Sequence, residues 1–264
     1  MSNFILNKIK SANIIFEPYP HIVIENFLED DFFKKLNLPN YDDIDDNVYF
    51  QDNKHSKKSI VDNSLDNSNY LKLLKINKNF KSFDDIFKNN IEIKNVIFKK
   101  FEKYLKEHLS MNLDDINTTT SINYSVSKPG YLKEIHIDRR EHIINILYYL
   151  NECDDSAKLE LWKEKKLSEI NDVFPKRSDL LLSKSYPIKK NSAIIMINLP
   201  CAYHSVSIQS SKFLNRKYIY VVWDYVKNSR ITNVANNKSI IWKKKVSVVN
   251  ENRRINFINN EKNI

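Results

Sequence analysis

Eight short segments rich in β-branched and aromatic residues follow one another between residues 120 and 226. Each has the length of an ordinary strand, and turn-forming residues separate it from the next. Short strands at this spacing pack as a sandwich or a barrel. The segments are 120–126, 131–137, 143–150, 159–162, 180–185, 193–198, 203–208 and 218–226. The sequence therefore predicts a mainly β fold in this half of the chain.

The residues before this region predict a strand and helices that support the β fold. Residues 21–28 are largely apolar and predict a strand, and the acidic residues at the start of 29–36 favour a helix there. Residues 40–66 are rich in Asp, Asn and Ser, which predicts a long surface loop. From about Phe83 to Leu109, apolar residues recur at helical spacing with Lys and Glu between them. We expect an amphipathic helix over that range.

The chain has a formal net charge of +9, and most of this charge lies at one end. Residues 227–264 hold nine Lys and Arg against two Glu, so this segment alone contributes +7. The rest of the chain is nearly balanced. We therefore expect a basic C-terminal extension that can bind an acidic partner. Genome composition is the alternative source of part of this charge, because Lys, Asn and Ile are abundant throughout the chain.

The sequence contains one glycine, Gly130. Loops that bind phosphate need several glycines, because their backbone N–H groups approach the anion closely. Nucleotide sites of the Walker and dinucleotide-binding kinds are therefore excluded.

Cysteine content and hydropathy indicate a soluble protein of a reducing compartment. Only Cys153 and Cys201 occur, whereas secreted domains commonly carry a larger, even set. No segment has the length and apolar character of a signal peptide or a membrane span. We expect a cytoplasmic location.

Three residues have the character and spacing of metal ligands. His136 and Asp138 are two residues apart, at the end of the predicted strand 131–137 and directly after it, and in an extended chain side chains at i and i+2 point to the same face. His204, in a later predicted strand, is the best candidate for a third ligand. Two histidines and one carboxylate on one face are typical of Fe(II) sites that activate dioxygen, because positions for cosubstrate and dioxygen stay open.

Arg216 stands at the start of a later apolar and aromatic strand, twelve residues after His204. This strand would run back beside the metal, where the guanidinium could bind a carboxylate through two hydrogen bonds. A buried arginine is costly without an anionic partner, so binding an organic acid explains it more simply than a structural role.

These residues belong to a longer series of motifs: Gly130-Tyr-Leu-Lys-Glu-Ile-His-Ile-Asp138, Ile146-Leu-Tyr-Tyr-Leu-Asn151, Leu159-Glu-Leu-Trp162, His204 and Arg216-Lys-Tyr-Ile-Tyr-Val-Val-Trp223. In order and spacing the series resembles the prolyl-4-hydroxylase-like branch of the 2-oxoglutarate/Fe(II) dioxygenases, over about residues 120–226. Ala157-Lys158 replace the Gly-Gly usual in that family, which bears on the subfamily more than on the ligands. The resemblance implies a double-stranded β-helix, or jelly-roll, core with flanking helices.

The resemblance also implies roles for individual residues. His136, Asp138 and His204 would be the catalytic iron ligands, and Arg216 would bind the distal carboxylate of 2-oxoglutarate. Tyr149 matches a position whose hydroxyl helps to hold that carboxylate. Tyr124 matches a position on a strand that faces the pocket, and Asn145 faces the same way as Tyr149 by strand alternation. Both tyrosines have an alternative role as filling of the barrel core.

The activity implied is hydroxylation of a C–H bond with Fe(II), dioxygen and 2-oxoglutarate, releasing succinate and CO2, and the family allows ascorbate as a reductant. The substrate would be peptidyl proline, another amino-acid-like compound or another small molecule. Two other classes stay open: an inactive barrel that serves as a binding module, and a cupin-like metal enzyme that does not use 2-oxoglutarate. The chain would comprise a strand and helical support region with the loop 40–66 (1–119), the catalytic core (120–226) and the basic extension (227–264).

Overall fold

The computed structural model describes residues 1–44, 57–62, 67–108, 117–139, 142–153, 157–165, 174–199, 201–208 and 215–225. The predicted basic extension, 227–264, lies outside these residues, as does much of the predicted loop 40–66. The expectations about the extension and its acidic partner therefore stay predictions.

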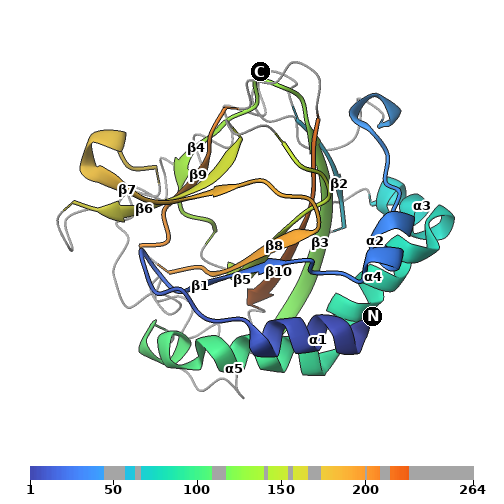
Figure 1. Cartoon of the computed structure of the whole chain (residues 1–264), viewed down its shortest axis with the longest axis horizontal. Coiled ribbons are helices and arrows are strands. Elements are labelled where there is room, and N and C mark those ends of the chain that lie inside the picture. The colour runs from blue at the N-terminus through green and yellow to red at the C-terminus, as the bar shows by residue number, and fades with distance from the viewer. Residues whose placement is uncertain are drawn as a thin grey trace.

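The described strands form two antiparallel sheets that face each other (Figure 1). One sheet has six strands in the order β1-β8-β5-β10-β3-β2, and the other has four in the order β4-β9-β6-β7. Their bounds are β1 His21–Glu25, β2 Lys57–Val61, β3 Thr118–Ser127, β4 Lys133–His136, β5 His142–Tyr149, β6 Lys158–Glu164, β7 Leu180–Pro187, β8 Ser192–Ile197, β9 His204–Val206 and β10 Arg216–Tyr225.

The connections between the sheets are those of a jelly roll. From β3 to β10 the chain passes from one sheet to the other at each step, except at the β6–β7 hairpin, whose strands are neighbours in the same sheet. Strands β1 and β2 add to the two edges of the larger sheet. The predicted mainly β fold with a double-stranded β-helix core is confirmed.

The alternation of residues in β10 explains how the larger sheet can have two buried faces. Ile219, Val221 and Trp223 are fully buried and lie on the outer face, whereas Arg216 and Tyr218 point to the space between the sheets. Successive side chains of a strand point to opposite faces, so one strand supplies both an apolar outer layer and a polar, aromatic inner lining.

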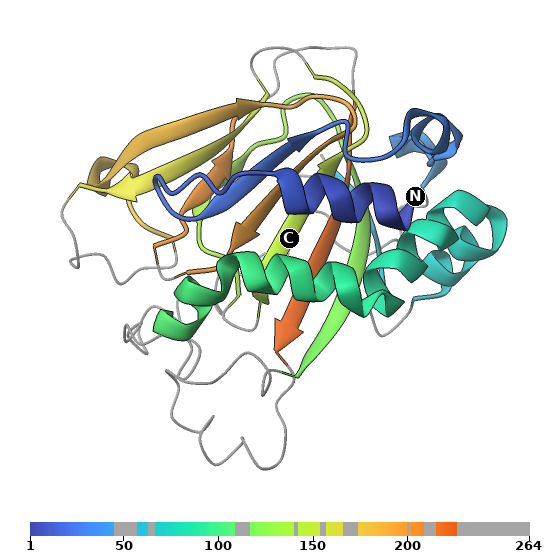
Figure 2. The same cartoon turned by 60° about the horizontal axis from the view of Figure 1, so that its bottom comes forward.

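Helices cover the outer face of the larger sheet, with α1 and α5 crossing it side by side (Figure 2). The helices are α1 Ser2–Ser11, α2 Asp30–Lys35, α3 Ser68–Ile76, α4 Lys78–Asn89 and α5 Ile91–His108. In α5 the buried residues Ile93, Ile97 and Phe101 recur every four residues and form its apolar stripe. Among the described residues, no helix is both long enough and apolar enough to cross a membrane.

Two segments differ from the sequence-based expectation. The helix expected from Phe83 to Leu109 is interrupted at Asn90, which separates α4 from α5. The Asn90 side chain accepts hydrogen bonds from the backbone N–H groups of Glu92 and Ile93 (3.0 and 3.2 Å), so it caps a new helix. Lys57–Val61, inside the expected loop, forms the edge strand β2, which pairs with β3.

Candidate metal centre

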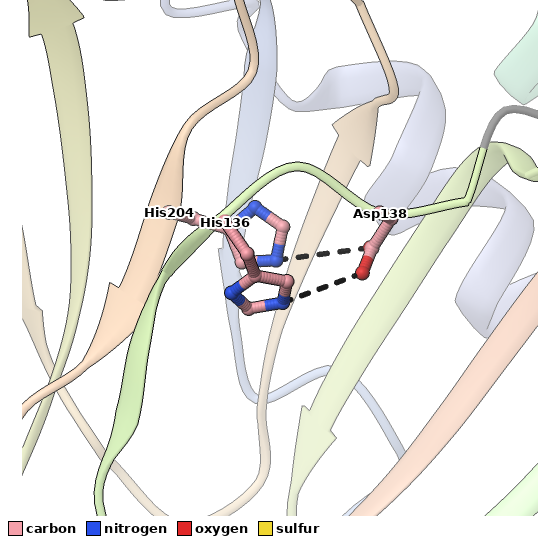
Figure 3. A group of neighbouring side chains, drawn as sticks. All are labelled: His136, Asp138 and His204. Atoms are coloured by element: carbon pink, nitrogen blue, oxygen red, sulfur yellow. Dashed lines mark ion pairs between the residues drawn. The ribbon is translucent and has the colours of Figure 1, made fainter. Parts of the chain in front are cut away.

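The structure brings His136, Asp138 and His204 together between the two sheets (Figure 3). His136 ends β4 and His204 begins β9, and the two residues are directly opposite each other in the antiparallel pair. Asp138 follows β4 by two residues. One potential ligand atom from each side chain lies within 4.8 Å of the others, which is close enough for one cation to contact all three.

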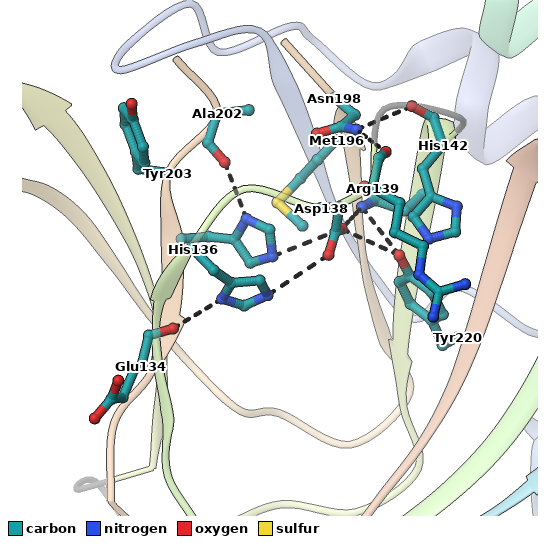
Figure 4. Close-up of polar contacts among 12 residues, drawn as sticks. Glu134, His136, Asp138, Arg139, His142, Met196, Asn198, Ala202, Tyr203 and Tyr220 are labelled. Carbon is teal, nitrogen blue, oxygen red and sulfur yellow. Dashed lines mark hydrogen bonds and ion pairs between the residues drawn. The ribbon is translucent and has the colours of Figure 1, made fainter. Parts of the chain in front are cut away.

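Backbone hydrogen bonds orient both imidazole rings (Figure 4). Nδ1 of His136 donates to the carbonyl of Glu134 (2.8 Å), and Nδ1 of His204 donates to the carbonyl of Ala202 (3.0 Å). A carbonyl oxygen can only accept, so each Nδ1 carries a hydrogen, which leaves Nε2 as the ring nitrogen that can bind a metal. The two Nε2 atoms lie 3.5 and 3.7 Å from the carboxylate oxygens of Asp138. Such backbone contacts are the usual means of fixing metal-ligating histidines.

Two further residues hold the Asp138 carboxylate in place. Oδ2 accepts hydrogen bonds from the amide of Asn145 and from the hydroxyl of Tyr220, the latter at 3.1 Å. Burial alone would raise the pKa of Asp138, but His204 and His136 outweigh it and hold the pKa well below its usual value. Asp138 therefore offers an ionised carboxylate at neutral pH.

Burial has the opposite consequence for His204. It lowers the pKa of the imidazole to about 4, and the neighbouring His136 adds to this effect. His204 is therefore neutral at physiological pH, the form that binds metals. Two imidazole nitrogens and one carboxylate fit a divalent first-row transition metal such as Fe(II).

A cavity of about 410 Å³ contains this group and extends along the inner face of the larger sheet. Arg216 lines the same cavity, although it is only 1% exposed to solvent. Its guanidinium lies over the ring of Tyr131, at 4.9 Å from the centroid. Of the residues that the structure describes, none accepts a hydrogen bond from Nη1 or Nη2. A buried cation with both terminal nitrogens available indicates a site for an anionic group.

The remaining predicted site residues lie at different places. Tyr149 lines the cavity, and its hydroxyl is close enough to Arg216 for the cation to lower its pKa, although burial raises the pKa more. Asn145 faces inward as expected, but it contacts Asp138. The placement of Tyr124 in the pocket is wrong. Its neighbours Asn123 and Ser125 line the cavity, so strand alternation points Tyr124 to the outer face, where its hydroxyl donates to the carbonyl of Pro39.

Sequence reasoning missed several residues of the cavity wall. Tyr218 and Tyr220 could have been found, because they follow Arg216 by two and four residues in one strand and so share its face. Lys57 gave no such signal, since its segment looks like a polar loop. His142 also lines the cavity, and it is hydrogen-bonded to Asp224.

No protein-family model matches the sequence, and no curated protein is similar to it in sequence. Three solved structures similar to this one are prolyl hydroxylases. They are a Pseudomonas putida prolyl-4-hydroxylase (10% identity, 86% of this chain and 100% of that chain, TM-score 0.42), a Trichoplax adhaerens prolyl hydroxylase in complex with a hypoxia inducible factor peptide fragment (13%, 84% and 88%, 0.44), and a Phytophthora capsici prolyl 4-hydroxylase (12%, 91% and 74%, 0.48).

Identities this low indicate at most a shared fold. The sheet order and the grouping of His136, Asp138 and His204 are features of this chain itself. In its double-stranded β-helix and in the order of its motifs, the chain resembles the prolyl-4-hydroxylase-like branch of the 2-oxoglutarate/Fe(II) dioxygenases.

Proposed function

We propose that this chain is an Fe(II)- and 2-oxoglutarate-dependent dioxygenase that hydroxylates a C–H bond. The observation that supports this best is the position of Arg216 relative to the three candidate ligands. A metal group alone would fit many barrel enzymes, but here the same cavity also holds a buried guanidinium with both terminal nitrogens available. A 2-oxo diacid has the two ends that such a cavity requires, one that chelates a metal and one that is an anion.

The residues would divide the work as follows. His136, Asp138 and His204 hold the metal on one face, and Asn145 and Tyr220 keep the Asp138 carboxylate oriented. Fe(II) bound there would supply the oxidation of a C–H bond by dioxygen, coupled to conversion of 2-oxoglutarate into succinate and CO2.

Arg216 and Tyr149 act at the other end of the cavity. The guanidinium binds the distal carboxylate, and the Tyr149 hydroxyl donates a hydrogen bond to it. Burial raises the pKa of Tyr149, which keeps its proton in place for that role. These contacts fix the cosubstrate at a definite distance from the metal, since the barrel walls hold both ends.

We extend the proposal to a peptidyl or amino-acid-like substrate, peptidyl proline among them. The support for this part is the motif resemblance alone. Proline-containing peptides, free amino acids and unrelated small molecules can be compared by how much each stimulates succinate formation by the Fe(II)-loaded protein. Stimulation by a non-amino-acid compound only would contradict this part and leave the reaction type intact.

The reaction type is tested with Arg216→Ala. We expect succinate release from 2-oxoglutarate to fall roughly 100-fold or more, because two charge-assisted hydrogen bonds are lost. Iron content should be unchanged, since Arg216 is not a metal ligand. Arg177→Ala is the matched control: it removes the same charge from an exposed residue that stacks on Trp162, outside the cavity.

The same measurements distinguish the proposed dioxygenase from an inactive barrel and from a metal enzyme that does not use 2-oxoglutarate. A wild-type protein that binds neither iron nor 2-oxoglutarate would be an inactive barrel. A protein that binds iron but forms no succinate with any substrate, and whose Arg216→Ala variant behaves like wild type, would be a metal enzyme of another kind. Either result would overturn the proposal.

A further inference from the structure

A second cation, Lys57, lies beside Arg216 in the wall of the cavity. Lys57 of the edge strand β2 lines the cavity, and its ammonium group lies 5.6 Å from the ring centroid of Tyr218 and 5.9 Å from that of Tyr131. The Arg216 guanidinium lies over the same two rings, at 5.8 and 4.9 Å. Two positive side chains therefore share one pair of tyrosines.

The strand register explains why they meet. Lys57 and Arg216 both pair with Ser127, from the two strands that flank β3. The three residues therefore form one row across the sheet, with neighbouring strands about 4.8 Å apart. Ser127 is fully buried, and its hydroxyl, like the terminal nitrogens of Arg216, has no hydrogen-bond partner among the described residues. The row thus places a buried hydroxyl between two cations, although of the three side chains only those of Lys57 and Arg216 line the cavity.

The pKa of Tyr218 reflects the positive potential beside Lys57 and Arg216. Burial by itself would raise the pKa of its hydroxyl, but Lys57 and Arg216, together with hydrogen bonds from Lys57 and Ser125, lower the pKa below its usual value. A tyrosine that is buried and still easier to ionise lies in a strongly positive environment.

We propose that Lys57 is a second cationic contact for the distal carboxylate of 2-oxoglutarate, acting with Arg216 from the two strands that flank β3. This inference rests on the proposed function. It makes Lys57 a specificity-determining residue: two cations favour a 2-oxo acid with a charged far end over one with an apolar far end. The edge strand β2, outside the jelly roll, then completes the cosubstrate pocket.

The test is binding of 2-oxoglutarate to the Zn(II)-loaded protein, measured by calorimetry in the absence of turnover. We expect Lys57→Met to weaken binding about 10- to 100-fold, the effect of one lost charge-assisted hydrogen bond. Binding of 5-methyl-2-oxohexanoate, which has the same shape but an uncharged far end, should change less than about threefold. In turnover with Fe(II), the KM for 2-oxoglutarate should rise while kcat at saturation stays nearly constant.

Three further variants separate charge from structure. Lys57→Gln keeps a hydrogen-bond donor for Tyr218 without the charge, and it should weaken binding as Lys57→Met does even if the latter folds poorly. Lys57→Arg keeps the charge and should retain most of the affinity. Lys217→Met is the matched control: Lys217 is adjacent to Arg216 but faces away from the cavity, with its ammonium group 3.3 Å from the carbonyl of Leu38.

The results distinguish the inference from the function on which it rests. If wild type does not bind 2-oxoglutarate, the proposed function fails. If wild type binds it and Lys57→Met and Lys57→Gln bind equally well, only the role of Lys57 is overturned. The role of Lys57 would also be overturned if Lys57→Met lost equal affinity for 2-oxoglutarate and for its uncharged analogue. The same holds if Lys57→Arg lost as much affinity as Lys57→Met, because either result would show a structural effect.

Discussion

Asn145 and Tyr220 contact the only carboxylate of the candidate metal group. Their hydrogen bonds go to the same oxygen, Oδ2 of Asp138, and Asn145 is also within 3.3 Å of the Tyr220 hydroxyl. Asp138 lies in the connection after β4, where no strand pairing fixes it, so these side chains determine where its carboxylate points. Outer contacts of this kind usually change metal affinity 10- to 100-fold.

We therefore predict that Asn145→Leu, which keeps the size of the side chain, weakens Mn(II) or Fe(II) binding about 10- to 100-fold. Competition with a chromogenic chelator measures the change. Asn123→Leu is the control, because Asn123 lines the same cavity but accepts its hydrogen bond from the backbone of Asp62. Equal metal affinity in both variants would show that Asn145 does not position the carboxylate.

Spacing along the chain decided which of the candidate site residues could be predicted. His136 and Asp138 are two residues apart, and the motif series located His204 and Arg216, so a one-dimensional pattern was enough for these four. Tyr124 was assigned to the pocket from a position in the family pattern. Its neighbours Asn123 and Ser125 face inward, and a shift of one residue along a strand moves a side chain to the opposite face. Lys57 depends on pairing between distant segments, which its local sequence does not encode.

Asn90 links two helices that together cover the larger sheet. Its backbone N–H bonds the carbonyl of Ile86 at the end of α4, and its side chain caps the first turn of α5. Its amide group also donates to the hydroxyl of Ser2 at the start of α1. One residue therefore marks where α4 ends and where α5 begins, and it also contacts the start of α1.

Asn90→Ala should lower the free energy of unfolding by about 1 kcal/mol, because the first turn of α5 loses its cap. Asn89→Ala is a sharp control one residue earlier: it is exposed, lies inside α4 and should be neutral or slightly stabilising, since alanine is the better helix former. Urea titrations of the two variants measure the difference. Equal stabilities would contradict the capping role.

The strands were easier to predict than the break between the helices. Each strand of the jelly roll had a dense run of β-branched and aromatic residues, and the observed bounds differ from the expected ones by a few residues at most. The apolar pattern from Phe83 onward continues through Asn90, so periodicity alone could not show the interruption. Strand β2 was missed because KKSIV has too few apolar residues to stand out, and it becomes a strand by pairing with β3.

The helical region and the jelly roll share one continuous hydrophobic core, which runs from Ile5 in α1 to Tyr225 in β10. Aromatic rings form the link between them. Phe87 of α4 lies 4.7 Å from Phe83, 6.2 Å from Phe27 and 6.3 Å from Trp223 of β10 between ring centroids. The two regions predicted on either side of residue 120 thus share one core, and the boundary between them remains a prediction.

Phe87→Ala should destabilise the whole protein by about 3–5 kcal/mol, since it removes a fully buried ring from this link. In a denaturant titration, the unfolding midpoint measured by helical circular dichroism and the midpoint measured by tryptophan fluorescence should shift by the same amount. Leu71→Ala, at an exposed position of α3, should leave both unchanged. Two separate transitions in the Phe87 variant would show that the helices and the barrel fold independently.

Strands β4 and β9 are among the shortest of the described strands, and their pairing comprises Lys133 with Val206 and His136 with His204, with an irregular register between the two pairs. The second pair consists of the two candidate imidazole ligands. A divalent ion held by both rings would join these strands as a cross-link does, at a place where backbone pairing is short and irregular. Loss of the ion would then loosen the pairing of β4 with β9, which form part of the cavity wall, and so weaken binding of the proposed cosubstrate.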